Sequence, residues 1–101
     1  MVDVGAKAVT RRTAVAAGSI RMSAEAFGLV ERNSGPKGDV VTTAELAGVA
    51  AAKRTGELIP LCHPLGLDVV RVVATLAPEL PGVKVTATAQ ATARTGVEME
   101  A

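Results

Sequence analysis

Apolar and polar residues alternate along the stretch Val83-Lys84-Val85-Thr86-Ala87-Thr88-Ala89-Gln90-Ala91-Thr92-Ala93. Successive side chains of a β-strand point to opposite faces of a sheet, so this stretch predicts a strand with one buried apolar face and one polar face. The residues 67–76 are largely apolar on both faces, and the connecting segment 77–82 contains prolines and a glycine that favour a turn. We therefore expect two antiparallel strands, over 67–76 and 83–93.

The segments N-terminal to this pair predict a further strand and a helix. Residues 2–17 are rich in Val, Ala and Thr, which favours one long strand or a broken pair of strands, and Gly18 is expected to break the segment. Ser23 occupies an N-cap position, and the run Asn33-Ser34-Gly35-Pro36 is a strong helix stop. We expect the first helix over 23–33.

A second helix is expected after a short extended piece at residues 40–41. Thr42 or Thr43 can cap this helix, and Pro60 ends it because proline cannot continue a helix interior. Its apolar side consists mostly of small residues, which allow close packing. The chain is thus predicted to be a single α+β domain over residues 1–101, in which helices pack on one face of an antiparallel sheet.

Composition limits the classes of partner. The chain has 101 residues with one Phe, no Trp and no Tyr, and its net charge is +1. A core of Val, Ala and Leu buries little apolar area per residue, so we expect the protein to gain burial as a homo-oligomer. The charge provides no field that would attract nucleic acid or a membrane surface. A single cysteine, with no signal peptide at the start, fits a cytoplasmic protein.

The only cysteine and the only histidine are adjacent in the run Leu58-Ile59-Pro60-Leu61-Cys62-His63-Pro64-Leu65. The two prolines predict a rigid, non-helical segment. It is either a buried turn with an inert thiol or a binding loop. Neighbouring residues of an extended segment point in opposite directions, so Cys62 and His63 are not expected to form a nucleophile–base pair. The chain has no second Cys or His, and no metal site is predicted.

The remaining polar groups are separated along the chain. Lys37 lies in a Gly-bracketed turn, His63 lies in the rigid loop, and Glu98 and Glu100 lie in a segment that has the capping-box spacing of a helix start. Such a set suits cofactor-free acid–base chemistry on an anionic substrate, although spacing alone does not show that the groups converge. The sequence ends within this expected helix, which indicates a partial chain.

Several motifs together resemble the MoaC family of cyclic pyranopterin monophosphate synthases, which acts in molybdenum cofactor biosynthesis. The similarity covers essentially the whole chain. The motifs are Met1-Val2-Asp3-Val4, Lys37-Gly38-Asp39-Val40, Ala51-Ala52-Lys53-Arg54-Thr55, residues 57–65 and Thr95-Gly96-Val97-Glu98-Met99-Glu100-Ala101.

The resemblance implies a fold, an assembly and a reaction. The fold is a ferredoxin-like α+β arrangement, and the assembly is a hexamer built as a trimer of dimers, with active sites at a dimer interface. The reaction is a rearrangement of a cyclised dihydro form of GTP into cyclic pyranopterin monophosphate, with release of diphosphate. The family uses no redox cofactor and has no known requirement for a tightly bound metal.

The resemblance also assigns roles to individual residues. It implies catalytic roles for Lys37, which can also contact the triphosphate, and for His63. It implies substrate contacts for Leu61, Cys62, His63, Glu98, Met99 and Glu100, and a role in phosphate binding or at an interface for Lys53 and Arg54.

The sequence departs from the family at its C-terminal end. Family members continue beyond the position of Ala101 with an Asp-Met-Cys-Lys-Ala-type motif, whose Asp acts in proton transfer and whose Lys is essential. We therefore expect the 101 residues alone to be inactive. The alternatives are a short paralogue that oligomerises or binds a pterin or nucleotide without turnover, and an unrelated α+β binding module.

Overall fold

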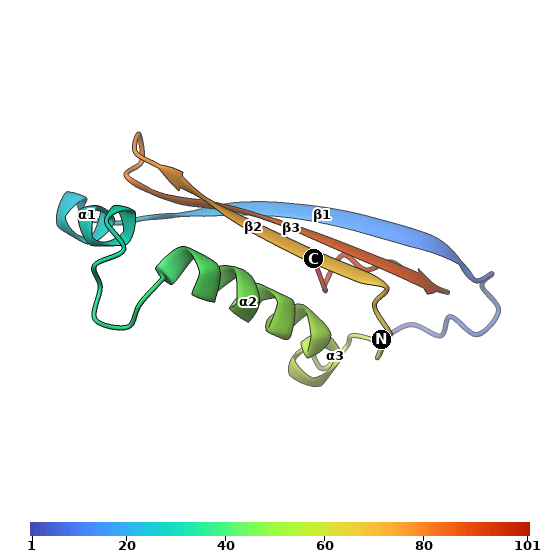
Figure 1. Cartoon of the computed structure of the whole chain (residues 1–101). Coiled ribbons are helices and arrows are strands. Elements are labelled where there is room, and N and C mark those ends of the chain that lie inside the picture. Colours follow the sequence, from blue (N-terminus) through green and yellow to red (C-terminus); the bar gives the residue numbers. More distant parts are fainter.

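A computed structural model describes residues 1–101 and contains one three-stranded antiparallel sheet with the strand order β1-β3-β2 (Figure 1). The elements are the strands β1 (Thr10–Arg21), β2 (Val69–Ala77) and β3 (Gly82–Ala93) and the helices α1 (Ala24–Glu31), α2 (Val40–Lys53) and α3 (Thr55–Leu58). The predicted α+β class is confirmed. None of the helices combines the length and the apolar character needed to cross a membrane.

The central strand β3 confirms the alternation seen in the sequence. Val83, Ala89 and Ala91 on its apolar face are buried, whereas Lys84 and Thr86 on its polar face are exposed. The strand pairs with β2 on one side and with β1 on the other, so that Ala89 lies between Val70 and Ala14. The sheet therefore has one apolar face that is partly covered and one Thr-rich face that no helix covers (Figure 1).

The prediction for residues 2–17 is wrong at both ends. The strand β1 begins only at Thr10 and continues through Gly18 to Arg21, because the whole stretch pairs with β3 and places Gly18 opposite Val85. Residues 1–9 instead contain a local turn. The Asp3 side chain accepts a hydrogen bond from the Gly5 N–H (2.8 Å), a self-contained alternative to strand pairing.

The first helix is close to the prediction, whereas the start of the second helix is not. The Ser23 hydroxyl caps α1 by accepting a hydrogen bond from the Ala26 N–H (3.1 Å). Residues 40–41 are helical rather than extended, because Asp39 is the N-cap of α2 and accepts from the Thr42 N–H (3.0 Å). A carboxylate accepts this bond without having to orient a hydroxyl proton, and its charge suits the positive end of the helix dipole.

Helix α2 packs on the edge strand β2 and on the apolar face of the sheet. Gly48 permits the close approach, since an added Cβ there would lie 2.9 Å from the Cγ1 atom of Val72. The Glu45 carboxylate accepts the N–H of Ala74 at 3.0 Å, which satisfies a donor on an edge strand that would otherwise be open to pairing with another chain.

The C-terminal segment folds back over the other part of the apolar face. Val97 is fully buried against Ala89 and Ala91. The Ala101 N–H donates to the Val97 carbonyl (3.1 Å) and closes a single turn, so the predicted helix start is present only as this turn. The burial of Val97 thus fixes the positions of Glu98 and Glu100 in the same turn.

Candidate functional site

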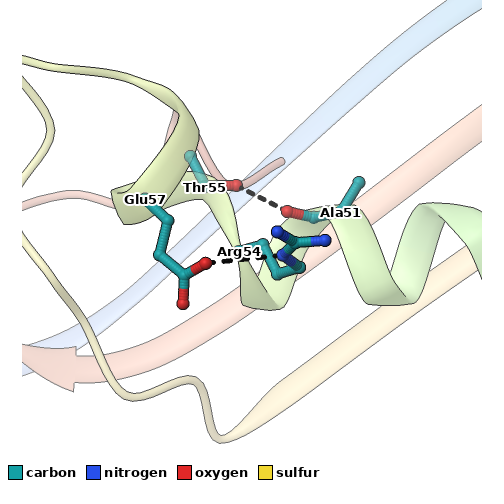
Figure 2. A network of polar contacts seen from close by, with 4 residues as sticks. All are labelled: Ala51, Arg54, Thr55 and Glu57. Atoms are coloured by element: carbon teal, nitrogen blue, oxygen red, sulfur yellow. Dashed lines mark hydrogen bonds and ion pairs between the residues drawn. The ribbon is translucent and has the colours of Figure 1, made fainter.

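The loop that carries Cys62 and His63 begins where the helical part of the chain ends. Figure 2 shows how α2 passes into α3: the Thr55 hydroxyl donates to the Ala51 carbonyl (3.1 Å), and Arg54 pairs with Glu57 (3.4 Å). The sequence predicts that the second helix continues to Pro60, but α2 ends at Lys53 and a separate short helix, α3, ends at Leu58, two residues before Pro60. The loop is therefore held by a buried threonine on one side and by two prolines within it.

Cys62 contacts the C-terminal turn. Its thiol donates to the Glu100 carboxylate (Sγ–Oε1 3.4 Å), and the side chains of both residues are buried. Burial, and secondarily the neighbouring Glu100 carboxylate, raises the pKa of the Cys62 thiol above its ordinary value. A thiol that stays protonated is a poor nucleophile. Cys62 therefore acts as a hydrogen-bond donor that orients Glu100.

Glu100 lines an apolar cavity of about 350 Å³ between α2, the sheet and the C-terminal turn. Most of the lining is small or aliphatic, and Glu100 is the only charged residue in it. A carboxylate has acceptor capacity for several hydrogen bonds, and the weak thiol donor is its only hydrogen-bond partner in the structure. A buried carboxylate is costly unless it is well paired. The cavity is thus suited to a ligand that brings N–H donors on an otherwise apolar ring.

His63 faces a different cavity of about 410 Å³. This cavity lies between the Cys-His loop, the end of β3 and the N-terminal segment, and Arg94 and Thr95 also line it. Cys62 and His63 therefore serve opposite sides of the loop, as expected for neighbouring residues of an extended segment. The prediction that the two side chains do not form a nucleophile–base pair is confirmed, because the thiol bonds to Glu100.

Lys37 lines neither of these two cavities. It lines a separate cavity of about 340 Å³ with the residues of its own turn and the first turns of α2. Gly38 has a φ of 89°, a conformation that favours glycine and lets the turn present the lysine. The 14 residues of α2 span about 20 Å at 1.5 Å per residue, and the Cys-His loop follows the far end of this helix (Figure 1). One chain does not bring Lys37 and His63 together.

The other residues with implied roles are distributed unevenly around these cavities. Met99 lines the same cavity as Glu100, while Leu61 and Glu98 are exposed. The Arg54 guanidinium is occupied by Glu57, and both side chains are more than half exposed, so this pair contributes about 0–1 kcal/mol. Lys53 is exposed at the end of α2 and lines another cavity, of about 310 Å³, with Asp68.

Sequence reasoning missed Arg94 as a site residue. It directly follows the predicted strand over 83–93, and the structure places it in the cavity of His63. Its position directly before the Thr95-Gly96 pair is the signal that could have identified it. The contact between Cys62 and Glu100 was missed as well, since it joins residues 38 positions apart.

The fold and these cavities define a small α+β protein whose Cys-His loop lies between a cavity lined by Glu100 and a cavity lined by His63 and Arg94. The MoaC family model matches residues 1–101, and the chain belongs to the MoaC family. The chain is 55% identical over all 101 residues to a protein of Oleidesulfovibrio alaskensis named cyclic pyranopterin monophosphate synthase. Proteins of the same name from Novosphingobium aromaticivorans and Cereibacter sphaeroides are each 54% identical over all 101 residues. The chain spans 64%, 63% and 64% of the lengths of these three relatives, respectively.

Proposed function

We propose that this protein acts in molybdenum cofactor biosynthesis as a cyclic pyranopterin monophosphate synthase. This lyase converts a cyclised dihydro form of GTP into cyclic pyranopterin monophosphate and diphosphate. The main support is the identity of 55% to a synthase of that name over the whole chain. The motifs of the Cys-His loop and of the C-terminal turn contribute to this match, and the structure joins them through Cys62 and Glu100.

In this proposal the loop and the C-terminal turn bind the two ends of the substrate. Glu100 accepts hydrogen bonds from the N–H edge of the ring system, beside Met99. Leu61 and Cys62 hold the Cys-His loop against the substrate, and His63 hydrogen-bonds to the substrate or moves a proton. Each group needs only its ordinary chemistry, since carboxylates accept from amide-like N–H groups and a neutral imidazole both donates and accepts.

Lys37 enters the site from a second copy of the chain. The length of α2 separates Lys37 from His63 within one copy, so a substrate that uses both residues binds between copies. Sparse burial supports association, because only 12 of the 101 residues are buried and large side chains such as Leu46, Leu61 and Val15 are more than 60% exposed. We propose a homo-oligomer, a hexamer as in the family, located in the cytoplasm, where the free Cys62 thiol stays reduced.

A reaction assay tests the proposal. The full product of the reading frame and the 101-residue chain are each supplied with the cyclised GTP intermediate, and cyclic pyranopterin monophosphate and diphosphate are measured. We expect turnover from the full product and binding without turnover from the 101 residues. The 101 residues lack the Asp-Met-Cys-Lys-Ala-type motif whose Asp acts in proton transfer in the family, and general acid–base groups account for about 10²–10⁴ in rate. Binding without turnover by both proteins favours the non-catalytic alternative, and the absence of both binding and turnover overturns the proposal.

A mixing experiment tests the shared site. Lys37→Ala and His63→Ala variants of the full product are inactive separately if each residue is required. Mixed and allowed to exchange subunits, they form some sites with an intact Lys37 from one copy and an intact His63 from the other. Recovered turnover supports a site between copies. Two inactive variants that exchange subunits and recover no turnover would show that the two residues act within one copy.

A further inference from the structure

The cavity of His63 contains a cationic group, Arg94, to which the proposed function gives no role. Arg94 and His63 line the same space of about 410 Å³, and no acidic residue lines it. The Arg94 guanidinium forms no salt bridge, since the ion pairs in the structure are Arg54–Glu57 and Lys84–Glu79. Asp68 does not line this space, and its carboxylate accepts a hydrogen bond from the hydroxyl of the lining residue Thr92 (3.0 Å). The donors of Arg94 are free for a ligand.

The two sides of the Cys-His loop are therefore opposite in charge. The cavity on the Cys62 side has Glu100 as its only charged residue, whereas the cavity on the His63 side has Arg94 and a free Thr95 hydroxyl. A planar guanidinium can donate two parallel hydrogen bonds to phosphate oxygens. A ligand with an N–H-rich ring at one end and phosphate at the other end would fit these two sides in one orientation only.

We propose that Arg94, together with His63, binds the phosphate end of the substrate and thereby sets the direction in which the substrate lies across the Cys-His loop. The inference rests on the proposed function for the identity of the substrate. The binding chemistry itself is that of a diphosphate group, which can be tested without turnover.

Inorganic diphosphate is the probe, and His63 is the reporter. Because His63 is the only histidine, its imidazole Cε1–H gives one assignable NMR signal. Diphosphate is titrated into the 101-residue chain at constant ionic strength, since screening changes any charge-based affinity. We expect the His63 signal to shift in a saturable way. Arg94→Gln should weaken binding about tenfold or more, as for loss of a charged hydrogen bond, and Arg94→Lys should weaken it less because the charge is kept.

Arg71→Gln is the matched control, because Arg71 is exposed like Arg94 and forms no ion pair, but it does not line the cavity of His63. It should change affinity less than about twofold. Far-ultraviolet circular dichroism verifies that each variant is folded. Equal effects of Arg94→Gln and Arg71→Gln overturn the role of Arg94, and an unshifted His63 signal in the unmodified chain overturns the phosphate site. Neither result depends on synthase activity, so failure of the proposed function is recognised separately by the reaction assay.

Discussion

Replacing Gly48 with alanine is expected to loosen the packing of α2 on the sheet, on which the position of the Cys-His loop depends. The new Cβ would lie 2.9 Å from Cγ1 and 3.0 Å from Cγ2 of Val72. Val72 is β-branched and has little rotational freedom at χ1, and it is fixed by pairing with β3 opposite Ala87. The helix must therefore move away from the strand.

Two effects of opposite sign determine how much Gly48→Ala changes the free energy of unfolding. Replacing glycine with alanine inside a helix stabilises it by about 1 kcal/mol, and overpacking a well-packed contact costs about 1–3 kcal/mol. Gly48→Ala should therefore leave stability unchanged or lower it by up to about 2 kcal/mol. Gly28→Ala in α1 is the matched control, because its Cβ would meet only the guanidinium end of Arg32, which is flexible and can move aside. That variant should be more stable than the unmodified chain by about 1 kcal/mol.

Urea unfolding followed by circular dichroism measures the difference, at equal protein concentrations because association shifts apparent stability. The dependence of the free energy of unfolding on urea concentration should have the same slope for all variants, so differences between their urea midpoints report differences in stability. In thermal unfolding, each kcal/mol corresponds to about 4–8 °C in Tm. In a Val72→Ala background the contact is absent, and Gly48→Ala should then stabilise the protein like Gly28→Ala. If Gly48→Ala already does so with Val72 present, the reasoning about α2 and β2 is wrong.

Three further outcomes follow from single contacts. Gly82→Ala should cost about 3 kcal/mol or more, because its Cβ would overlap a backbone carbonyl of β1 that cannot move aside, whereas Gly18→Ala, with open space around it, should stabilise β1 by about 0.5–1 kcal/mol in thermal unfolding. The hydrogen bond that caps α2 lowers the pKa of Asp39, so the charged carboxylate contributes to the free energy of unfolding at neutral pH, and this contribution is lost as the pH falls through the lowered pKa. The stability difference between Asp39→Ala and the unmodified chain should therefore narrow over that range. A constant difference would contradict the capping role. The raised pKa of Cys62 should make its alkylation by iodoacetamide slower than that of a peptide cysteine at pH 8. Glu100→Gln removes the neighbouring negative charge but not the burial of the thiol, so it should restore only part of the rate. An unchanged rate in this variant would argue against the contact between Cys62 and Glu100.

The sequence predicts best those elements whose causes are local. The period-two pattern of 83–93 depends only on neighbouring residues, and it matches β3 from Gly82 to Ala93. The Ser23 cap is equally local and is found in α1. The start of β1 is not local, because pairing with β3 decides which of the Val- and Thr-rich residues become strand. The predicted start of α2 is too late, because Thr42 and Thr43 can each cap a helix, whereas Asp39, three residues before Thr42, is the N-cap in the structure.

The candidate site shows the same division. The opposite directions of Cys62 and His63 follow from the extended loop between the two prolines, and they are predictable from sequence. The partner of Cys62 is not predictable in this way, since Glu100 reaches it only because Val97 is buried against β3. Arg94 directly follows β3, which ends at Ala93, and nothing in the alternation pattern of 83–93 marks it as a site residue. Its place in the cavity depends on where the loop and the N-terminal segment meet the end of that strand.

The separation of Lys37 from His63 connects the stability of the fold to the proposed function. The chain measures 53 × 24 × 21 Å, and α2 holds these two residues at its opposite ends. A compact monomer could bring them together only by losing the contact of α2 with β2, which the Glu45–Ala74 hydrogen bond and the Gly48–Val72 approach maintain. The proposed association of copies would require no such loss, and it would also cover exposed apolar side chains that a core built largely from alanine and valine leaves at the surface. In the proposed homo-oligomer, one interface would complete both the hydrophobic burial and the site, so substitutions that weaken association should reduce ligand binding even where they touch no ligand.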